Sequence, residues 1–470
     1  MARGKKKESA LTPEEKLAQA LVPVEEQPYQ VPENWCWARI GAISDFERGI
    51  TFPASAKENE PTEENIPCLR TANVQENLEI DDLIYVNQSF MKGNEAKLVR
   101  ENDIIMSSAN SRELVGKASF VTHVPFPMTF GGFVLNIRAR GISSKYLFYF
   151  LRQEFLAGKF MGESTQTTNI ANINTTTLGS YELPLPPLAE QQRIVDRIEY
   201  LFAKLDEAKE KAQSVLDSFE TRKAAILHKA FTGELTSKWR AEHGVEMDNW
   251  KQGCLNDFCE INPKKAATKD LPDDLEVSFV PMTALSDILG EITDPQVRKL
   301  KEVRTGFTNF SEGDVVFAKI TPCMENGKSA VVGPLVNDIG FGTTEFYVLR
   351  CSKMLFNRYL YHLVRSRTFR AEAKAVMTGA VGQQRVPKSF LEDYPLTIPS
   401  VPEQVEIVRI LDSLFAKEQQ AKEAAEAVLE KIDLLKKSIL ARAFRGELGT
   451  NDPTEESALE LLKEKLKGDI

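Results

Sequence analysis

An internal repeat constrains the fold of this chain more than any other feature of its sequence. The segment PPLAEQQRIVDRIEYLFAKLDEAKEKAQSVL, which begins at Pro186, aligns without a gap to PSVPEQVEIVRILDSLFAKEQQAKEAAEAVL, which begins at Pro399, at a constant offset of 213 residues. The match continues through AILHKAFTGEL and SILARAFRGEL, which end at Leu235 and Leu448. Self-similarity at a fixed offset indicates duplicated structural units, so the chain is interpreted as two copies of a domain followed by a long helix.

Each copy of the repeated segment has the heptad pattern of a coiled coil. The apolar positions alternate spacings of three and four residues, and they are Ile198, Leu201, Leu205, Ala208, Ala212, Val215, Phe219, Arg222 and Ile226 in the first copy and Leu411, Leu414, Glu418, Ala421, Ala425, Val428, Ile432, Leu435 and Ile439 in the second. Such a stripe favours a partner helix, for which the other copy is the nearest candidate. A helix packed only on its own domain is the alternative, but residues 188–230 would span roughly 65 Å, more than the width of one small domain.

The linker between the copies predicts the direction of the two helices. Residues 236–249 number fourteen and reach at most about 50 Å when fully extended. Parallel helices would require this linker to return along the first helix, whereas antiparallel helices would not. We therefore expect an antiparallel pair related by a pseudo-twofold axis, with the two polar residues of the seam, Arg222 and Glu418, within about one helical turn of each other.

The segments before the two helices predict domains of the mixed α/β class. Short β-branched or apolar runs broken by Asn, Ser and Gly indicate strands, and SKYLFYFLRQEF and FNRYLYHLVRSRTF indicate one helix in each segment. Trp35 and Trp250 correspond at an offset of 215. The predicted organisation is an N-terminal extension (1–31), a first domain (32–185), a central long helix with linker (186–245), a second domain (246–398), a C-terminal long helix (399–449) and a tail (450–470).

Composition limits the classes of function. The net charge is −9, but residues 36–185 carry a net charge of −3 and residues 251–398 one of +1. The acidic excess therefore lies mainly outside the two domains, which permits DNA binding without predicting it. No run of about 18 apolar residues and no signal peptide is found, so no membrane contact and a cytoplasmic location are expected. The six cysteines form no CxxC pair and are interpreted as ordinary thiols.

Catalytic motifs are missing from the sequence. The GKS at Gly327 lacks the upstream glycine of a phosphate-binding loop, and the Asn-Pro at Asn262 is not the Asn-Pro-Pro-Tyr type of tetrapeptide that holds an extruded base. The four histidines, at positions 123, 228, 243 and 362, have no metal-ligand spacing. We therefore expect no catalytic residue, no metal site and no cofactor on this chain.

Polar side chains that bond to base edges and phosphates instead cluster at turns between the predicted strands. The candidate DNA-binding residues of the first domain are Arg70, Thr71, Asn73, Ser107, Ser108, Asn110, Ser111, Arg112, Lys117, Gln166, Thr167, Thr168 and Asn169. Those of the second domain are Lys319, Thr321, Asn326, Lys328, Thr343, Thr344, Gln383, Gln384 and Arg385. Any one of these residues alone is typical of an ordinary loop, so the prediction lies in the clusters.

The residues from about Val31 to Leu448 resemble the specificity subunits of Type I restriction–modification systems (HsdS family). The resemblance is carried by PLPPLAEQQRIV, FAKLD and AFTGELTSKWRAEH, by their second-copy forms IPSVPEQVEIV, FAKEQ and AFRGEL, and by FAKITPCMENGKSAVV with FGTTEFYVLR. It implies two target-recognition domains separated by an antiparallel coiled coil of two long conserved helices. Each domain would read one half of a bipartite site in double-stranded DNA, and the helices would set the gap.

The same resemblance implies partner proteins. The helices would dock two methyltransferase subunits, which bind S-adenosylmethionine and methylate adenine, and separate restriction subunits would perform ATP-driven translocation and cleavage. Residues 1–30 and the tail DPTEESALELLKEKLKGDI depart from the simplest pattern. We expect the extension to contact a partner subunit, and the role of the tail is left open.

Two other functions compete with this interpretation. A self-contained DNA methyltransferase or nuclease with a duplicated recognition region would need its own cofactor pocket, so purified chain would bind S-adenosylmethionine. A structural coiled-coil adaptor would leave the Thr-, Gln- and Asn-rich loops of both domains unexplained, and DNA-binding assays with and without methyltransferase partners would identify it.

Overall fold

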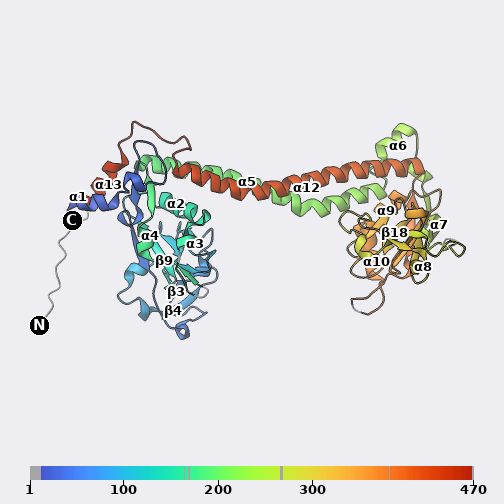
Figure 1. The fold of residues 1–470 in the computed structure, drawn as a ribbon, viewed down its shortest axis with the longest axis horizontal. Helices are drawn as coiled ribbons and strands as arrows, with labels where there is room; N and C mark the ends of the chain where they lie inside the picture. Colours follow the sequence, from blue (N-terminus) through green and yellow to red (C-terminus); the bar gives the residue numbers. More distant parts are fainter. Residues whose placement is uncertain (1–11, 164, 168–169, 265–267, 381, 468–470) are drawn as a thin grey trace. The chain divides into compact units, whose positions relative to one another are not determined.

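The chain divides into two compact units, each of which combines one globular domain with parts of both long helices. The computed structural model describes residues 12–163, 165–167, 170–264, 268–380 and 382–467 (Figure 1). Unit 1 comprises Met1–Lys211 and Val428–Ile470, and unit 2 comprises Ala212–Ala427. The long helices α5 (Leu188–Phe231) and α12 (Val401–Phe444) therefore contribute residues to both units.

The domain of unit 1 is built from small sheets. A four-stranded antiparallel sheet has the order β2-β9-β5-β7, a three-stranded sheet has the order β4-β3-β8, and another has the order β10-β11-β6. The first and last strands, β1 and β12, pair antiparallel and close the domain. The strands are β1 (Cys36–Arg39), β2 (Ser44–Arg48), β3 (Asn65–Leu69), β4 (Ile84–Asn87), β5 (Ile104–Ser107), β6 (Ala109–Asn110), β7 (Ala118–Phe120), β8 (Thr129–Phe130), β9 (Val134–Ala139), β10 (Thr165–Thr167), β11 (Ile170–Asn172) and β12 (Glu182–Leu185). The helices are α2 (Ser144–Leu156), α3 (Lys159–Glu163) and α4 (Thr175–Gly179).

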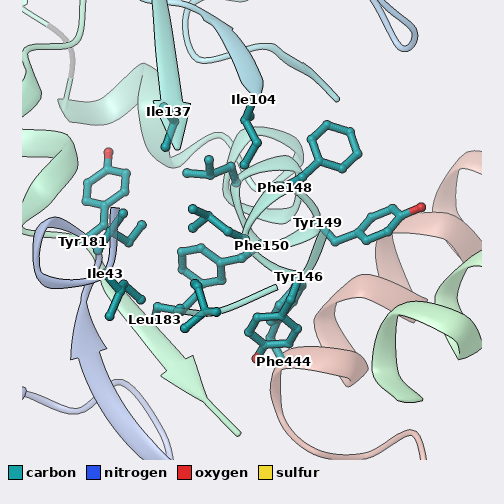
Figure 2. Close-up of a cluster of buried hydrophobic side chains, with 14 of the residues drawn as sticks. Ile43, Ile104, Ile137, Tyr146, Phe148, Tyr149, Phe150, Tyr181, Leu183 and Phe444 are labelled. Carbon is teal, nitrogen blue, oxygen red and sulfur yellow. The ribbon is translucent and has the colours of Figure 1, made fainter. Parts of the chain in front are cut away.

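The core of unit 1 lies between the four-stranded sheet and α2 (Figure 2). The α2 helix begins after Ser143, whose hydroxyl accepts a hydrogen bond from the Tyr146 amide and so satisfies a free N–H of the first turn. Tyr146 and Phe150 point from α2 toward Phe444, with ring centroids 5.2 and 5.3 Å from the Phe444 ring (Figure 2). The end of α12 is therefore part of the core of the first domain.

Unit 2 repeats this plan with its own sheets. Two four-stranded sheets have the orders β14-β21-β18-β19 and β16-β15-β20-β17, and β13 pairs antiparallel with β22. The strands are β13 (Lys251–Cys254), β14 (Cys259–Ile261), β15 (Glu276–Val280), β16 (Gln296–Lys299), β17 (Thr308–Phe310), β18 (Val315–Ala318), β19 (Ser329–Val331), β20 (Gly340–Gly342), β21 (Phe346–Cys351) and β22 (Pro395–Ile398). The helices are α6 (Ser237–His243), α7 (Leu255–Phe258), α8 (Leu300–Val303), α9 (Asn357–Arg365), α10 (Arg367–Ala375) and α11 (Lys388–Glu392).

The helix predicted over residues 356–369 is in fact two helices. α9 ends at Arg365, and α10 begins at Arg367. Ser366 between them has extended backbone angles, and its hydroxyl accepts a hydrogen bond from the Phe369 amide. An N-cap serine therefore starts a new helix inside a segment whose apolar pattern continues.

The long helices are antiparallel within each unit. In unit 2, Lys223 of α5 lies over the ring of Phe415, whereas Phe219, one turn earlier in α5, lies under Lys422, later in α12. The Arg222 Nε donates to Glu418 Oε2 at 2.8 Å. This contact confirms the predicted pairing of the two polar seam residues and the predicted antiparallel direction.

The seam of α12 differs from the predicted stripe at three of its nine positions. Ala425 and Ile432 are buried as expected, but Ala421 is exposed, Val428 is 40% exposed and Leu435 is 48% exposed. The residues that follow them in the sequence take part in the seam instead, including Lys422 and Lys436, whose ammonium groups lie 5.2 and 5.3 Å from the ring centroids of Phe219 and Phe202. The prediction was wrong here because long lysine side chains bury their methylene stems along apolar surface.

A buried glutamate near the start of each long helix joins that helix to its domain. The Trp35 indole N–H donates to Glu190 at 2.7 Å, and the Trp250 indole N–H donates to Glu403 at 3.1 Å. Glu190 also accepts from the side chain of Asn451, which follows α12. The same contacts therefore occur in both copies of the repeat. In each copy, the buried glutamate at the start of the long helix is also bonded by residues that follow the long helix of the other copy.

The N-terminal extension and the C-terminal tail pack together within unit 1. The predicted helices are present as α1 (Pro13–Ala20) and α13 (Ala458–Lys467), which lie side by side (Figure 1). The backbone amide of Ala458 donates to the carbonyl of Asn34, and the Arg193 guanidinium of α5 bonds both oxygens of Glu455 at 2.8 Å. Both segments therefore have an intramolecular role.

Candidate nucleic-acid interface

Two of the predicted clusters in the first domain are joined by backbone pairing. β11 pairs antiparallel with both β10 and β6, with Ala171 opposite Asn110 and Asn172 opposite Ala109. Gln166 and Thr167 lie on β10, whereas Thr168 and Asn169 lie outside the described residues. Residues 109–112 of the first cluster and the polar segment that contains β10 and β11 therefore form one candidate surface, which we call the unit 1 reading surface.

Not every polar side chain near this surface is available to a ligand. Ser107 and Ser108 are buried, and their hydroxyls bond the Asn110 side-chain amide and the Phe133 carbonyl. Asn73 is buried too, and its amide group bonds the backbone of Arg70 and Asp82. Hydrogen bonds of this kind shape turns. We therefore leave these three predicted residues out of the proposed reading surface.

Two predicted cationic residues of the first domain, Arg112 and Lys117, differ in how available their side chains are to a ligand. The Arg112 side chain is exposed, with one long bond of 3.4 Å from Nε to the Met161 carbonyl. The Lys117 ammonium donates to Gln75 Oε1 at 2.6 Å, and burial lowers the pKa of Lys117. Arg112 is therefore the more available contact for a phosphate or a base edge.

A cleft of about 450 Å³ lies beside Arg70 and Thr71 in unit 1. Arg70 also bonds Asp82, with 2.8 Å between its guanidinium and the carboxylate. Phe133 lines the same cleft, and 63% of its side chain is exposed. Because Ser108 bonds the Phe133 carbonyl, Phe133 connects the cluster at Arg70 and Thr71 with the cluster at residues 107–112. Sequence reasoning missed it, although the Gly131–Gly132 pair before it signals an exposed turn.

The second domain brings most of its predicted residues to one place. The Thr321 amide donates to the Gln384 carbonyl, and the Thr321 hydroxyl accepts from the Gln384 amide at 3.1 Å. Isolated bridges pair Arg385 with Ile320 and Thr378, as β11 pairs with β6 in the first domain. Thr343 and Thr344 precede Glu345, to which Arg385 bonds. The unit 2 reading surface consists of Lys319, Thr321, Thr343, Thr344, Gln383, Gln384 and Arg385.

An ion pair orients the cations of the unit 2 reading surface. Arg385 bonds Glu345 through Nε and a terminal nitrogen at 2.9 and 2.8 Å. Hydrogen bonding to Arg385 lowers the pKa of Glu345, and the charge of Lys319 lowers it further. The Lys319 ammonium lies 5.2 Å from the centroid of the Tyr347 ring. Both cations are therefore held in place but keep one face toward solvent.

Two predicted residues of the second domain lie apart from this surface. The Lys328 ammonium donates to the backbone carbonyls of Met282 and Leu285 at 3.1 and 2.8 Å, so it braces a loop. Asn326 is exposed, but it lines a cleft formed with α9, α10 and the long helices. We do not include Asn326 and Lys328 in the proposed reading surface.

The described residues offer little for catalysis. Within them, no three His, Cys, Asp or Glu side chains are arranged to hold a metal ion. Burial raises the pKa of the Cys36, Cys68 and Cys351 thiols to about 12, which disfavours the nucleophilic thiolate. Across the ranges that the structure covers, no helix is both long enough and apolar enough to span a bilayer. What the two surfaces present is hydrogen-bonding groups, on short strands in unit 1 and on loops joined by isolated bridges in unit 2, which suits recognition.

Comparison with known proteins identifies the repeated unit. The family model of the Type I restriction modification DNA specificity domain matches residues 32–216 and 247–431. The StySPI specificity subunit of Salmonella potsdam is 25% identical over 427 residues, which cover 89% of this chain and 90% of that protein. The EcoKI specificity subunit of Escherichia coli K12 is 26% identical over 428 residues, with the same coverage. The EcoEI specificity subunit of Escherichia coli is 34% identical, but only over 46% of this chain and 43% of that protein.

Solved structures show the same fold. The crystal structure of the HsdS subunit from Thermoanaerobacter tengcongensis covers 90% of this chain with a TM-score of 0.61 at 18% identity, and all of that chain is matched. A second chain, from a structural study of the assembly and conformational transition of the type I R-M system, has a TM-score of 0.59 at 19% identity. It covers 90% of this chain and is itself matched over its whole length.

Proposed function

Because this chain belongs to the Type I restriction modification DNA specificity family and contains two copies of its domain, we propose that each copy reads one half of a bipartite DNA site. The unit 1 and unit 2 reading surfaces would contact the two half-sites. The observation that carries this proposal is the shared backbone pairing, which presents different side chains in the two domains: Asn110 pairs with Ala171 in the first, and at the corresponding place Ile320 pairs with Arg385 in the second. A common scaffold with different polar groups is suited to reading two different sequences.

The long helices would serve both spacing and assembly. α5 and α12 each have 44 residues, and helices of this length extend roughly 66 Å at about 1.5 Å per residue. We propose that they set the unread gap between the half-sites and dock two methyltransferase subunits at equivalent surfaces of the repeat. Restriction subunits would join that complex. The chemistry of methylation and cleavage would then reside in the partners, and this chain would choose the sequence.

Methylation mapping tests the division of labour between the domains. We would express the chain with its methyltransferase subunits in a host without adenine methylation and determine the methylated motif by long-read sequencing. Arg112→Ala should change or relax only one half of the motif, and Gln383→Ala should change only the other half. Each lost base contact should cost about 1–3 kcal/mol of discrimination.

The control variant is Lys417→Ala, an exposed residue of α12 outside both reading surfaces, which should leave the motif unchanged. A continuous motif in the unmodified protein would refute the proposal. So would a change in both halves caused by a single substitution.

A further inference from the structure

Unit 2 contains a cationic cleft between the helix pair and the second domain. Its volume is about 430 Å³. Phe219 and Lys223 of α5, Phe415 and Gln419 of α12, and residues of α9 and α10 line it. Its charged lining residues are Lys223, Arg365, Arg367, Arg370, Glu220 and Glu423. We call this the unit 2 cleft.

The half-buried cations of this cleft are held by carbonyl groups and rings. The Lys223 ammonium lies 5.6 Å from the centroid of the Phe415 ring. Arg365 donates to the backbone carbonyls of Gly327 and Asp287 at 3.0 and 2.8 Å, and Arg370 donates to the carbonyl of Arg365 at 3.1 Å. Within the part of the chain that the structure describes, none of these cations forms an ion pair with a carboxylate. Burial lowers the pKa of Lys223; the charge of Glu220 raises it, and the charges of Arg365 and Arg370 lower it again, as expected for positive charges that crowd together.

The equivalent place in unit 1 is an internal control. The offset of 213 residues relates Lys436, Phe202 and Arg152 to Lys223, Phe415 and Arg365. The geometry repeats, because the Lys436 ammonium lies 5.3 Å from the centroid of the Phe202 ring. Here, however, the ammonium lies 2.6 Å from an oxygen of Asp206 and 3.7 Å from one of Glu76.

One of these two carboxylates also pairs with the arginine of unit 1. Arg152 forms an ion pair with Glu76, and this hydrogen bond is the main cause that lowers the pKa of Glu76. Unit 1 therefore neutralises its lysine and arginine from within, and the groups that do so are protein carboxylates.

In the described part of the chain, the second copy of the repeat lacks both of these ion pairs. The residue equivalent to Asp206 is Gln419, whose amide donates to Glu423 at 2.9 Å.

The loop equivalent to that of Glu76 contains Asp287 and Glu291, but among the described residues neither forms an ion pair with Lys223, Arg365 or Arg370, and only the backbone carbonyl of Asp287 bonds Arg365. The same loop carries Ile288 and Leu289, which are 87% and 61% exposed. The unit 2 cleft thus combines unpaired cations with exposed aliphatic side chains. Apolar groups of this kind beside a charge are typical of surfaces that bind another protein.

We propose that the unit 2 cleft binds a carboxylate-bearing, partly apolar segment of a protein partner, in the place that Glu76 and Asp206 fill in unit 1. The occupant is a segment of the methyltransferase subunit, so the inference rests on the proposed function. A DNA phosphate would satisfy the cations but would leave Ile288 and Leu289 exposed. The contact at unit 2 is then more electrostatic than the contact at unit 1, and salt weakens it more.

The assembled complex tests this difference between the two units. Native mass spectrometry of the chain with its methyltransferase subunits, at increasing ammonium acetate, should show loss of one subunit before the other. Hydrogen exchange on the same complex should lose protection first at residues 286–291 and 365–370, and later at residues 74–79. Lys223→Glu should weaken binding at unit 2 roughly tenfold or more at low salt, because it places a like charge opposite the incoming carboxylate.

Matched substitutions exchange the behaviour of the two units. Gln419→Asp restores the carboxylate of the first copy, so binding at unit 2 should weaken at low salt and lose its salt dependence. Asp206→Asn should make binding at unit 1 more sensitive to salt. Lys417→Glu, on α12 outside the cleft, is the charge control and should change neither unit.

Three outcomes separate the alternatives. Simultaneous salt release of both subunits in the unmodified complex, unchanged by Lys223→Glu, would overturn the proposal. If Lys223→Glu instead reduced only the binding of duplex DNA of random sequence, the cleft would be a phosphate site and the proposal would fail. An unmodified chain that binds no methyltransferase subunit would instead refute the function from which the inference starts.

Discussion

Glu403 and Arg240 form the most deeply buried ion pair described in unit 2, with 2.6 Å between the carboxylate and the guanidinium. The Thr236 hydroxyl donates to the same carboxylate oxygen at 2.7 Å, and Trp250 donates to the other. Arg240→Met would leave the carboxylate buried without a cation, so we expect a loss of about 3–5 kcal/mol in the free energy of unfolding. Urea denaturation monitored by tryptophan fluorescence measures this loss.

A surface ion pair in the same unit provides the comparison. Arg358 and Asp412 lie 3.1 Å apart, with side chains 51% and 42% exposed. Arg358→Met should therefore cost no more than about 1 kcal/mol. If Arg240→Met and Arg358→Met lowered the free energy of unfolding equally, burial would not explain the contribution of these ion pairs to stability.

Single residues were the least predictable level of this structure. The repeat aligns Glu190 with Glu403, but nothing in the sequence indicates that each accepts a hydrogen bond from a tryptophan. Ser108 was predicted to face DNA because it lies in a polar run, yet its hydroxyl donates to the Phe133 carbonyl, 25 residues away in the sequence. Side-chain exposure depends on such distant backbone partners, which a local pattern does not contain.

Among the secondary-structure elements, α12 offers a direct test of the corrected seam. Ile432 is 3% exposed in the core of the helix pair within unit 1, whereas Leu435, one turn later, is 48% exposed. Ile432→Ala should lower the free energy of unfolding by about 2–5 kcal/mol, because it removes a buried side chain and leaves a cavity. Leu435→Ala should cost well under that, and the difference between the two urea midpoints measures it. The stripe predicted from the sequence places both residues in the seam, so equal losses of stability for the two variants would support that stripe and contradict the corrected seam.

The heptad pattern predicted the existence and pairing of the long helices but was wrong at three positions of the α12 seam. Ala425 and Ile432 are apolar and were correctly placed. The other seam positions include Lys422 and Lys436, which a pattern of apolar letters passes over in favour of the preceding Ala421 and Leu435. Lysine stems packed on phenylalanine rings carry no signal in such a pattern. The strands and helices of the two domains were easier to predict, because β18 and β21 consist almost wholly of buried apolar residues.

For the whole molecule, the sequence predicted the class of fold and the family correctly. The offset of 213 residues identified two copies, and the short linker favoured an antiparallel pair, which the contact between Arg222 and Glu418 confirms. The mutual completion of the two domains was not foreseen. Phe444 joins the core of the first domain and Phe231 packs on Tyr359 of the second, with ring centroids 5.3 Å apart. These contacts join residues that lie far apart in the sequence, so local sequence motifs do not predict them.

The length of the helices makes a prediction about the whole DNA target. If α5 and α12 set the gap between the half-sites, an insertion of four residues into α5 should add about 6 Å, near two base-pair steps of about 3.4 Å each. Methylation mapping should then find a longer gap between two unchanged half-sites, because the insertion alters neither reading surface. A four-residue insertion at Gly306, in a turn of the second domain with open space around it, should leave the gap unchanged. Altered half-sites at a constant gap would show that the helices do not act as a ruler.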